Sequence, residues 1–160
     1  MGGFEEELKR ILVKEKIRAQ LDDVTNIKSP RTLALSVQWI SVGYASALYF
    51  AGKKLGTNIL AKELKGSDIK SILQSLGVLI KDLGIGNFEI VSVGDKKSVA
   101  RINDSMTAYG MKPVGKAVCY FESGLIAGVL EGKLGKKVTV NETLCGGLGD
   151  QTEEFLIRIA

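Results

Sequence analysis

The chain has 160 residues, of which 45% are hydrophobic and 25% charged, a composition typical of a single globular domain with one sizeable core. Its 22 basic and 18 acidic residues leave a formal charge of only +4 and are interleaved along the chain, so we expect no nucleic-acid partner. Two cysteines are too few for a disulfide scaffold, and the absence of histidine removes the commonest general base and any Ser/His or Cys/His nucleophilic pair.

The N-terminal stretch MGGFEEELKR carries acidic residues where a signal peptide would carry basic ones. We therefore expect a cytoplasmic protein with reduced thiols. Apolar residues then recur at helical spacing over residues 4–24, which predicts a first helix. We expect this helix to serve in forming a homodimer.

The next segment, residues 32–52, contains no charged residue and is just long enough to span a bilayer. Three serines and a glutamine interrupt it, so we favour a buried helix and expect no membrane partner. Ser29-Pro30 is a helix start signal, and the predicted helix runs from about residue 30 toward residue 60. Gly43, Gly52 and Gly56 lie in it and mark places where another backbone could come close.

Six further elements and a loop follow in an order that favours an α+β domain. Ser67-Asp68 opens a third helix that ends at Gly84, and two strands, 87–94 and 98–103, follow it around a tight turn. Residues 104–113 are expected to be loop, residues 114–134 a largely buried helix, and residues 136–144 and 153–160 a closing pair of strands. This order predicts helices packed on a small antiparallel sheet, in one domain spanning residues 1–160.

The period of two in the closing strands gives a first site hypothesis. Val138, Val140 and Glu142 share one face of their strand, and Glu153 and Phe155 share one face of the other. If the apolar members point inward, both carboxylates do so too, which is costly unless they are paired or bind a metal. With one cysteine at a strand end and one early in the buried helix, two thiolates and two carboxylates could converge on Zn²⁺. The competing interpretation is two core cysteines and two solvated glutamates.

Two other features of the sequence are a glycine-rich stretch and a set of aromatic and small residues on the helices. The stretch CGGLGD matches neither the Walker A nor the dinucleotide fingerprint, so we interpret it as a tight turn that uses the positive φ of glycine. The aromatic side chains Trp39, Tyr44, Tyr49, Tyr109 and Phe121 either pack in the core or line a ligand pocket between helices and sheet. Small residues on the same helices, Gly43, Ala45, Ala47, Gly124, Ala127 and Gly128, either leave room or permit close helix contact.

The C-terminal part also resembles a known family. The stretch VCYFESGLIAGVLEGKLGKKVTVNETLCGGLGDQTEEFLI is similar to the 4-vinyl-reductase domain: a cysteine early in a helix with spaced small residues, a strand ending in Glu-x-x-Cys, a glycine-rich turn with Gly-Asp, and a final strand. The matching positions are Cys119, Phe121, Gly124, Gly128, Gly135, Glu142, Cys145, Gly149, Asp150 and Phe155. The motif-bearing core covers about residues 95–160, and a glycine-punctuated helix upstream extends the likeness to about residue 30.

This resemblance implies a fold similar to TRAPP vesicle-tethering subunits and haem nitric-oxide sensors, and a role in binding small apolar molecules. In aromatic-sensing members, three cysteines and a glutamate hold zinc, and these ligands fall on Cys119, Glu142, Cys145 and Glu153 of this chain. Glu153 departs from the family pattern because it replaces a cysteine, although a carboxylate can still bind zinc. A histidine-ligated haem is excluded by the composition.

From the sequence we therefore expect a cytoplasmic homodimeric module that binds a small apolar ligand. A structural zinc would order its last strand pair. One alternative is a TRAPP-like adaptor with a filled core. The other, a reductase acting on a vinyl or tetrapyrrole substrate, is less favoured because no dinucleotide fingerprint is present, and we assign no catalytic residue.

Overall fold

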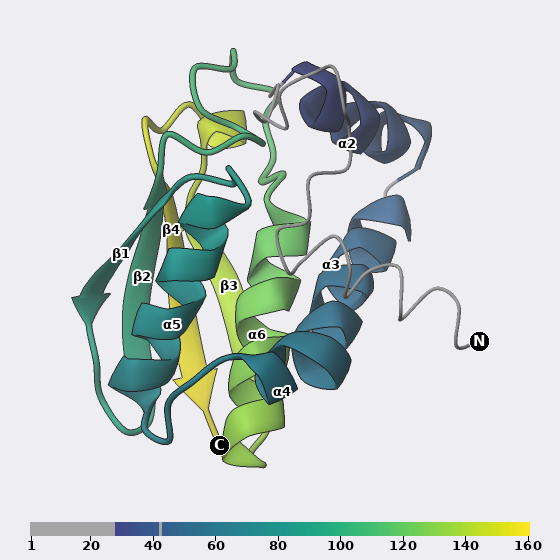
Figure 1. Ribbon diagram of the computed structural model, residues 1–160. Coiled ribbons are helices and arrows are strands. Elements are labelled where there is room, and N and C mark those ends of the chain that lie inside the picture. The colour runs from purple at the N-terminus through teal and green to yellow at the C-terminus, as the bar shows by residue number, and fades with distance from the viewer. Residues whose placement is uncertain (1–27, 42) are drawn as a thin grey trace, which may run out of the picture.

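The computed structural model describes residues 28–41 and 43–160 (Figure 1). The helix predicted for residues 4–24, and with it the predicted dimerisation element, lies outside the described residues. The elements in chain order are α2 (Lys28–Ile40), α3 (Gly43–Leu55), a π-helical turn η1 (Gly56–Leu60), α4 (Ala61–Glu63), α5 (Ile69–Asp82), β1 (Asn87–Ser92), β2 (Lys97–Asn103), α6 (Tyr120–Leu134), β3 (Val138–Leu144), a 3-10 turn η2 (Gly146–Leu148) and β4 (Glu153–Ile159).

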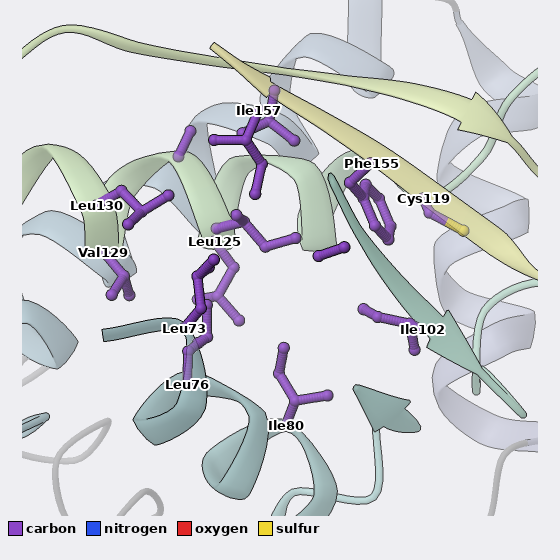
Figure 2. Packing of buried hydrophobic residues seen from close by; sticks show 14 of the residues in the cluster. Leu73, Leu76, Ile80, Ile102, Cys119, Leu125, Val129, Leu130, Phe155 and Ile157 are labelled. Carbon is purple, nitrogen blue, oxygen red and sulfur yellow. The ribbon is translucent and has the colours of Figure 1, made fainter. Parts of the chain in front are cut away.

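The four strands form one antiparallel sheet in the order β1-β2-β4-β3, with helices on one face (Figure 1). Helix α5 packs on β1 and helix α6 on β3, while α3 packs against α6. The core between α5, α6 and the sheet is apolar, and Figure 2 shows Ile102, Phe155 and Cys119 at one end of it and Val129 and Leu130 at the other. The predicted α+β architecture, helices on a small antiparallel sheet, is confirmed.

Helix α5 begins where its sequence signals predict. The Asp68 carboxylate accepts a hydrogen bond from the Ser71 backbone N–H at 3.0 Å, and the Asp68 backbone N–H donates to the Ser71 hydroxyl at 3.3 Å. This reciprocal pair satisfies two of the donors that the first turn of a helix leaves free. At the other end Gly84 has a φ of +68°, the left-handed conformation that favours glycine after a helix.

The predicted helix over residues 30–60 is wrong as one continuous element. Helix α2 ends at Ile40 and α3 begins at Gly43. The Ser41 hydroxyl accepts a hydrogen bond from the Gly43 N–H at 3.1 Å, and the Ser41 carbonyl accepts one from the Tyr44 N–H at 3.1 Å. A serine that bonds locally to the backbone starts a new helix here, which is the usual competition between this side chain and a helix interior.

The same segment is also less buried than predicted. Leu33, Ile40 and Phe50 are 68%, 72% and 64% exposed, and the buried residues of α3 are Ala45 and Gly52. Within the described part of the chain, no helix combines the length and the apolar character that crossing a bilayer requires.

The last helix starts later than the sequence predicted. Helix α6 begins at Tyr120, whereas the pattern suggested residue 114. The N–H groups of Val114 and Gly115 both donate to the Gly147 carbonyl, at 2.8 and 3.0 Å, so this segment is tied to the glycine-rich loop instead of coiling. The two strand pairs and the loop after β2 lie where they were predicted.

Helices α3 and α6 approach each other closely through glycines. A Cβ built on Gly124 would lie 2.0 Å from the Tyr49 carbonyl oxygen, and one on Gly52 would lie 2.2 Å from the Phe121 carbonyl oxygen. Of the two interpretations that the sequence left open for Gly124, close helix contact is the one observed, and the close backbone approach predicted at Gly52 is observed too. Among the described residues Gly43 has no such neighbour, since the nearest non-adjacent atom to a Cβ built there is the Ser41 hydroxyl oxygen at 3.5 Å.

Candidate metal centre and ligand cavity

Three of the four predicted metal ligands meet at one end of the core. Cys119 directly precedes α6, Glu142 lies late in β3, and Cys145 directly follows β3. One ligand atom from each, the two sulfurs and a carboxylate oxygen, all lie within 4.8 Å of one another. Both cysteines are buried and Glu142 is half-buried, so strand alternation from Val138 and Val140 has carried Glu142 to the inner face as predicted.

The glycine-rich loop holds Cys145 in place. The Cys145 backbone N–H donates to the Asp150 carboxylate at 2.8 Å, and its sulfur accepts from the Gly147 N–H at 3.3 Å. A Cβ on Gly146 would lie 2.2 Å from the Ala108 carbonyl oxygen, so only glycine allows the loop to approach the 104–119 segment. The tight turn predicted for CGGLGD is present, with Gly149 at a φ of +106°.

Cys119, Glu142 and Cys145 lie so close together that each shifts the pKa of the others. Hydrogen bonding from Cys119 lowers the pKa of Cys145 to about 5 against the opposing effect of burial, and a hydrogen bond from Glu142 lowers it further. Burial and the hydrogen bond to Cys145 raise the pKa of Glu142 to about 9, and the same contact with Cys145 raises the pKa of Cys119. Of the three groups, Cys145 is therefore the readiest to lose its proton, whereas Cys119 and Glu142 resist ionisation. A divalent cation would displace their protons.

The fourth predicted ligand, Glu153, lies on the inner face of β4 but outside this group of three. Its side chain is 1% exposed, and neither carboxylate oxygen has a hydrogen-bond partner among the described residues. Burial raises its pKa to about 7, with the Ser105 hydroxyl opposing the rise and the negative charge of Cys145 adding to it. Glu153 therefore remains a predicted ligand. It lies near enough to Cys145 for the negative charge of that sulfur to raise the pKa of Glu153.

A second buried carboxyl, Glu122, escaped the sequence analysis. It is 1% exposed in the first turn of α6, its Oε1 accepts a hydrogen bond from the Thr107 hydroxyl, and its Oε2 has no partner among the described residues. Burial raises its pKa. The signal was available, because Glu122 is an acidic residue in a helix whose other positions are apolar nearly all round, so it could not face solvent.

Two hollows adjoin these groups. An open groove of about 500 Å³ runs between α3, the start of α6 and β3, and Tyr49 and Glu142 are among its lining residues. A smaller cavity of about 210 Å³ lies between α2, α3, the 104–119 segment and α6. Its lining consists of Ala34, Leu48, Met106, Thr107, Val118, Phe121 and Glu122.

Of the aromatic residues predicted to line a pocket, some line one of these hollows and others are exposed. Phe121 lines the smaller cavity and Tyr49 lines the groove, whereas Tyr44 and Tyr109 are exposed and line neither. The side chain of Trp39 lies outside the described ones. Helix α2 forms one side of the cavity through Ala34. The Arg31 side chain of α2 donates hydrogen bonds to the carbonyl oxygens of Met106 at 2.8 Å and Ser105 at 3.2 Å, which holds α2 against the 104–119 segment.

Comparisons with known proteins give a consistent result. The family model of the vinyl-4-reductase domain matches residues 98–159. Uncharacterized protein MJ0150 of Methanocaldococcus jannaschii is 33% identical over 161 residues, covering 92% of this chain and 91% of that protein. A solved vinyl-4-reductase family protein from the same organism superposes with a TM-score of 0.65 at 18% identity, covering 99% of this chain and 94% of that one.

Three further solved structures share the fold. The phenol-responsive sensory domain of the transcription activator PoxR, solved with phenol, has a TM-score of 0.66 at 18% identity over 88% of this chain and 77% of that one. A trafficking protein particle complex subunit 3 from Naegleria fowleri has a TM-score of 0.54 at 17% identity (99% and 92% covered). An H-NOX protein from S. oneidensis has a TM-score of 0.53 at 14% identity (97% and 89% covered).

Proposed function

Since the chain belongs to the vinyl-4-reductase domain family, we propose that it is a small-molecule binding module whose C-terminal strands are held by a structural zinc ion. The bound molecule is small and mainly apolar. The observation that carries the proposal is the partly open cavity of about 210 Å³ between α2, α3, the 104–119 segment and α6. An engineered apolar cavity of about 150 Å³ in another protein binds benzene, so this volume suffices for a one-ring molecule.

The relatives support this assignment. The phenol-responsive sensory domain has the same fold and was solved with phenol. The cavity has a mainly apolar lining with few polar groups, which is the usual composition of a ligand site.

The donor set fits zinc. Cys119, Glu142 and Cys145 offer two sulfurs and a carboxylate, and Glu142 has a buried Oε1 without a hydrogen-bond partner among the described residues. The ion pairs of the described part of the chain, Lys53–Glu131 and Arg101–Glu154, do not involve this group. A zinc ion would tie the start of α6 to the end of β3, with Glu153 as the fourth ligand, and four protein ligands would leave no position for catalysis.

Metal content tests the zinc. Protein purified without added metal is examined by native mass spectrometry and again after treatment with a chelator. We expect about one zinc per chain, lost in Cys145→Ser, and a lower Tm after chelation because an ion that binds only the folded state stabilises it. The same spectra report retained organic molecules and the subunit count. A metal-free wild-type protein that takes up no zinc on addition would contradict the metal assignment.

Ligand binding is tested with small aromatic probes. Titrations of the zinc-loaded protein with toluene and phenol, followed by NMR shifts of the methyl groups of Leu48 and Val118, should saturate. Ala34→Phe fills the cavity and should abolish saturation, whereas Ser36→Phe, at an exposed position of the same helix, should not. Absence of binding to the wild-type protein would contradict the binding function.

A surface role is the second candidate, favoured by the exposed apolar side chains of α2 and α3. Leu33, Ile40 and Phe50 are each more than half exposed, as expected of a face that packs against another chain. They are consistent with the proposed homodimer as well as with an adaptor role. Analytical ultracentrifugation distinguishes the homodimer from the adaptor. A wild-type dimer that Phe50→Lys disrupts supports the homodimer, and a monomeric wild-type protein contradicts it.

A further inference from the structure

Basic residues that are far apart in the sequence meet at one end of the sheet. The Lys96 carbonyl oxygen accepts a hydrogen bond from the Ile159 N–H at 3.0 Å, and the Lys137 carbonyl oxygen accepts one from the Ala160 N–H at 2.9 Å. The turn before β2 and the turn before β3 are therefore both held against the end of β4. The exposed cations gathered there are Lys96, Lys97, Lys136, Lys137 and Arg158.

Some of these side chains form a row across the outer face of the sheet. Lys97 of β2 is paired with Arg158 of β4, which is paired in turn with Thr139 of β3. The residues next to them along each strand are buried, so strand alternation turns all three toward the face opposite the helices (Figure 1). Val99 and Leu156, which are half-buried, form the next row on the same face.

The basic row is not neutralised within the described part of the chain. Lys97 and Arg158 carry like charges at directly paired positions, an arrangement that destabilises a sheet. Further along the same strands, Arg101 is instead paired with Glu154, at 2.8 Å. No ion pair among the described residues involves Lys97 or Arg158, and Asp95 is the one acidic residue within two sequence positions of any of the five cations. Such a concentration of one charge attracts an oppositely charged partner.

We propose that this end of the outer sheet face is a docking surface for a partner protein, which it binds through an amphipathic helix with an acidic stripe beside an apolar one. The acidic stripe meets Lys97 and Arg158, and the apolar stripe meets Val99 and Leu156. The three strands span about 10 Å, because neighbouring strands lie about 4.8 Å apart, and two turns of helix cover about 11 Å. This surface is independent of the proposed zinc ion and cavity.

Two other occupants fit the surface less well. Proteins that bind single-stranded nucleic acid stack its bases on aromatic side chains, and no outward-facing residue of β2, β3 or β4 is aromatic. A second copy of the chain docked through the same face would bring two basic rows together, which is unfavourable.

The test uses the full chain and a fluorescent amphipathic peptide of about 14 residues, in which a stripe of glutamates lies beside a stripe of leucines. We expect it to bind about tenfold more tightly than the same peptide with glutamine in place of glutamate, and less tightly as the salt concentration rises. The variant Lys97→Glu/Arg158→Glu should lose about tenfold or more in affinity. The matched control Lys112→Glu/Lys116→Glu makes the same change in net charge at exposed positions beyond the other end of β2, and should keep the affinity.

The single substitution Lys97→Glu separates docking from stability. It turns the opposed pair into an ion pair with Arg158, so the Tm should rise by about 2–4 °C while the affinity for the glutamate peptide falls. A residue that serves the fold alone would behave in the opposite way, and a lower Tm in Lys97→Glu would overturn the proposal.

The peptide experiments can reject the docking surface in several ways. Equal binding of the two peptides, binding of neither, or an equal loss of affinity in the Lys112→Glu/Lys116→Glu control overturns the proposal. A thymidine oligonucleotide or phosphatidylserine vesicles that bind more tightly than the glutamate peptide at the same salt concentration assign the surface to nucleic acid or to a membrane instead. None of these results bears on metal content or on the binding of toluene and phenol.

Discussion

The contact between α3 and α6 predicts that Gly124→Ala is strongly destabilising. The added Cβ would lie 2.0 Å from the Tyr49 carbonyl oxygen, 2.8 Å from its carbonyl carbon and 3.0 Å from the Lys53 nitrogen. Ordinary van der Waals contact begins near 3.4 Å, so the helices would have to separate by 3.4 − 2.0 = 1.4 Å at this point. All three neighbours are backbone atoms, which cannot rotate away.

The expected magnitude follows from two opposing effects. Overpacking a closely packed site costs about 1–3 kcal/mol, and a rigid backbone neighbour places this one near ~3 kcal/mol. Alanine gains up to about 1 kcal/mol over glycine in a helix interior, which leaves a net loss of about 2 kcal/mol. For a chain of this size the loss corresponds to a decrease in Tm of about 4–8 °C.

Thermal unfolding followed by circular dichroism measures this change, and Gly43→Ala is the matched control. Gly43 opens α3, and within the described part of the chain no non-adjacent atom lies closer than 3.5 Å to a Cβ built there, so its substitution should leave the Tm unchanged or slightly raised. If Gly124→Ala proved as stable as Gly43→Ala, the helices would have room between them, and the close approach of α3 and α6 would be wrong. Because Leu48 of α3 lines the cavity, Gly124→Ala should also weaken probe binding.

Three further predictions concern the site and its cover. In the metal-free protein, the pKa of Glu153 is about 7, above its ordinary value of 4.5. The contribution of Glu153 to the free energy of unfolding is therefore complete below pH 4.5 and is lost as the pH rises through 7. The pKa shifts of Cys145 and Glu142 have opposite signs and similar sizes, so their effects on stability nearly cancel. The Tm of chelated protein should therefore fall between pH 5 and pH 8, by less in Glu153→Gln, and a flat or rising profile would contradict the burial of this carboxyl. Glu153→Cys introduces the cysteine that the sequence resemblance implies at this position and should strengthen zinc binding in a competition assay with a chromophoric chelator; unchanged affinity would remove residue 153 from the proposed ligand set. Arg31→Gln removes charged hydrogen bonds to the 104–119 segment, so amide hydrogen exchange should become faster in α2 but not in α5. Equal exchange rates in α2 of the variant and the wild-type protein would mean that Arg31 does not hold α2 against the 104–119 segment.

The sequence predicted those features whose signals are local. Asp68 and Gly84 delimit α5 because a capping side chain and a positive φ act within a few residues of the helix end. Strand alternation likewise placed Glu142 and Glu153 on the inner face, since the period of two does not depend on the rest of the fold.

Most of the features that were missed depend on contacts between distant segments. The late start of α6 comes from the Gly147 carbonyl oxygen, which accepts hydrogen bonds from two N–H groups of the 114–119 segment. The break between α2 and α3 is different, because Ser41 bonds to the backbone only two and three residues further along the chain. The cavity is assembled from residues as far apart as Ala34 and Glu122, and no periodicity links them. The hydrogen bond of Glu122 was hidden for the same reason, since its donor is Thr107 in a loop predicted only as a connection.

The first turn of α6 joins the two sites physically. Cys119, at the metal group, precedes Phe121 and Glu122, at the cavity, by less than one helical turn. The Cys119 backbone N–H also donates to Glu142 at 3.2 Å, and its carbonyl oxygen accepts from the Ser123 N–H at 3.1 Å, so the position of this residue determines where the first turn lies. An ion that fixes the Cys119 sulfur would therefore fix the wall of the cavity. Because coupling between two bound species is reciprocal, a ligand bound in the cavity would change zinc affinity by the same factor by which zinc changes the affinity for that ligand.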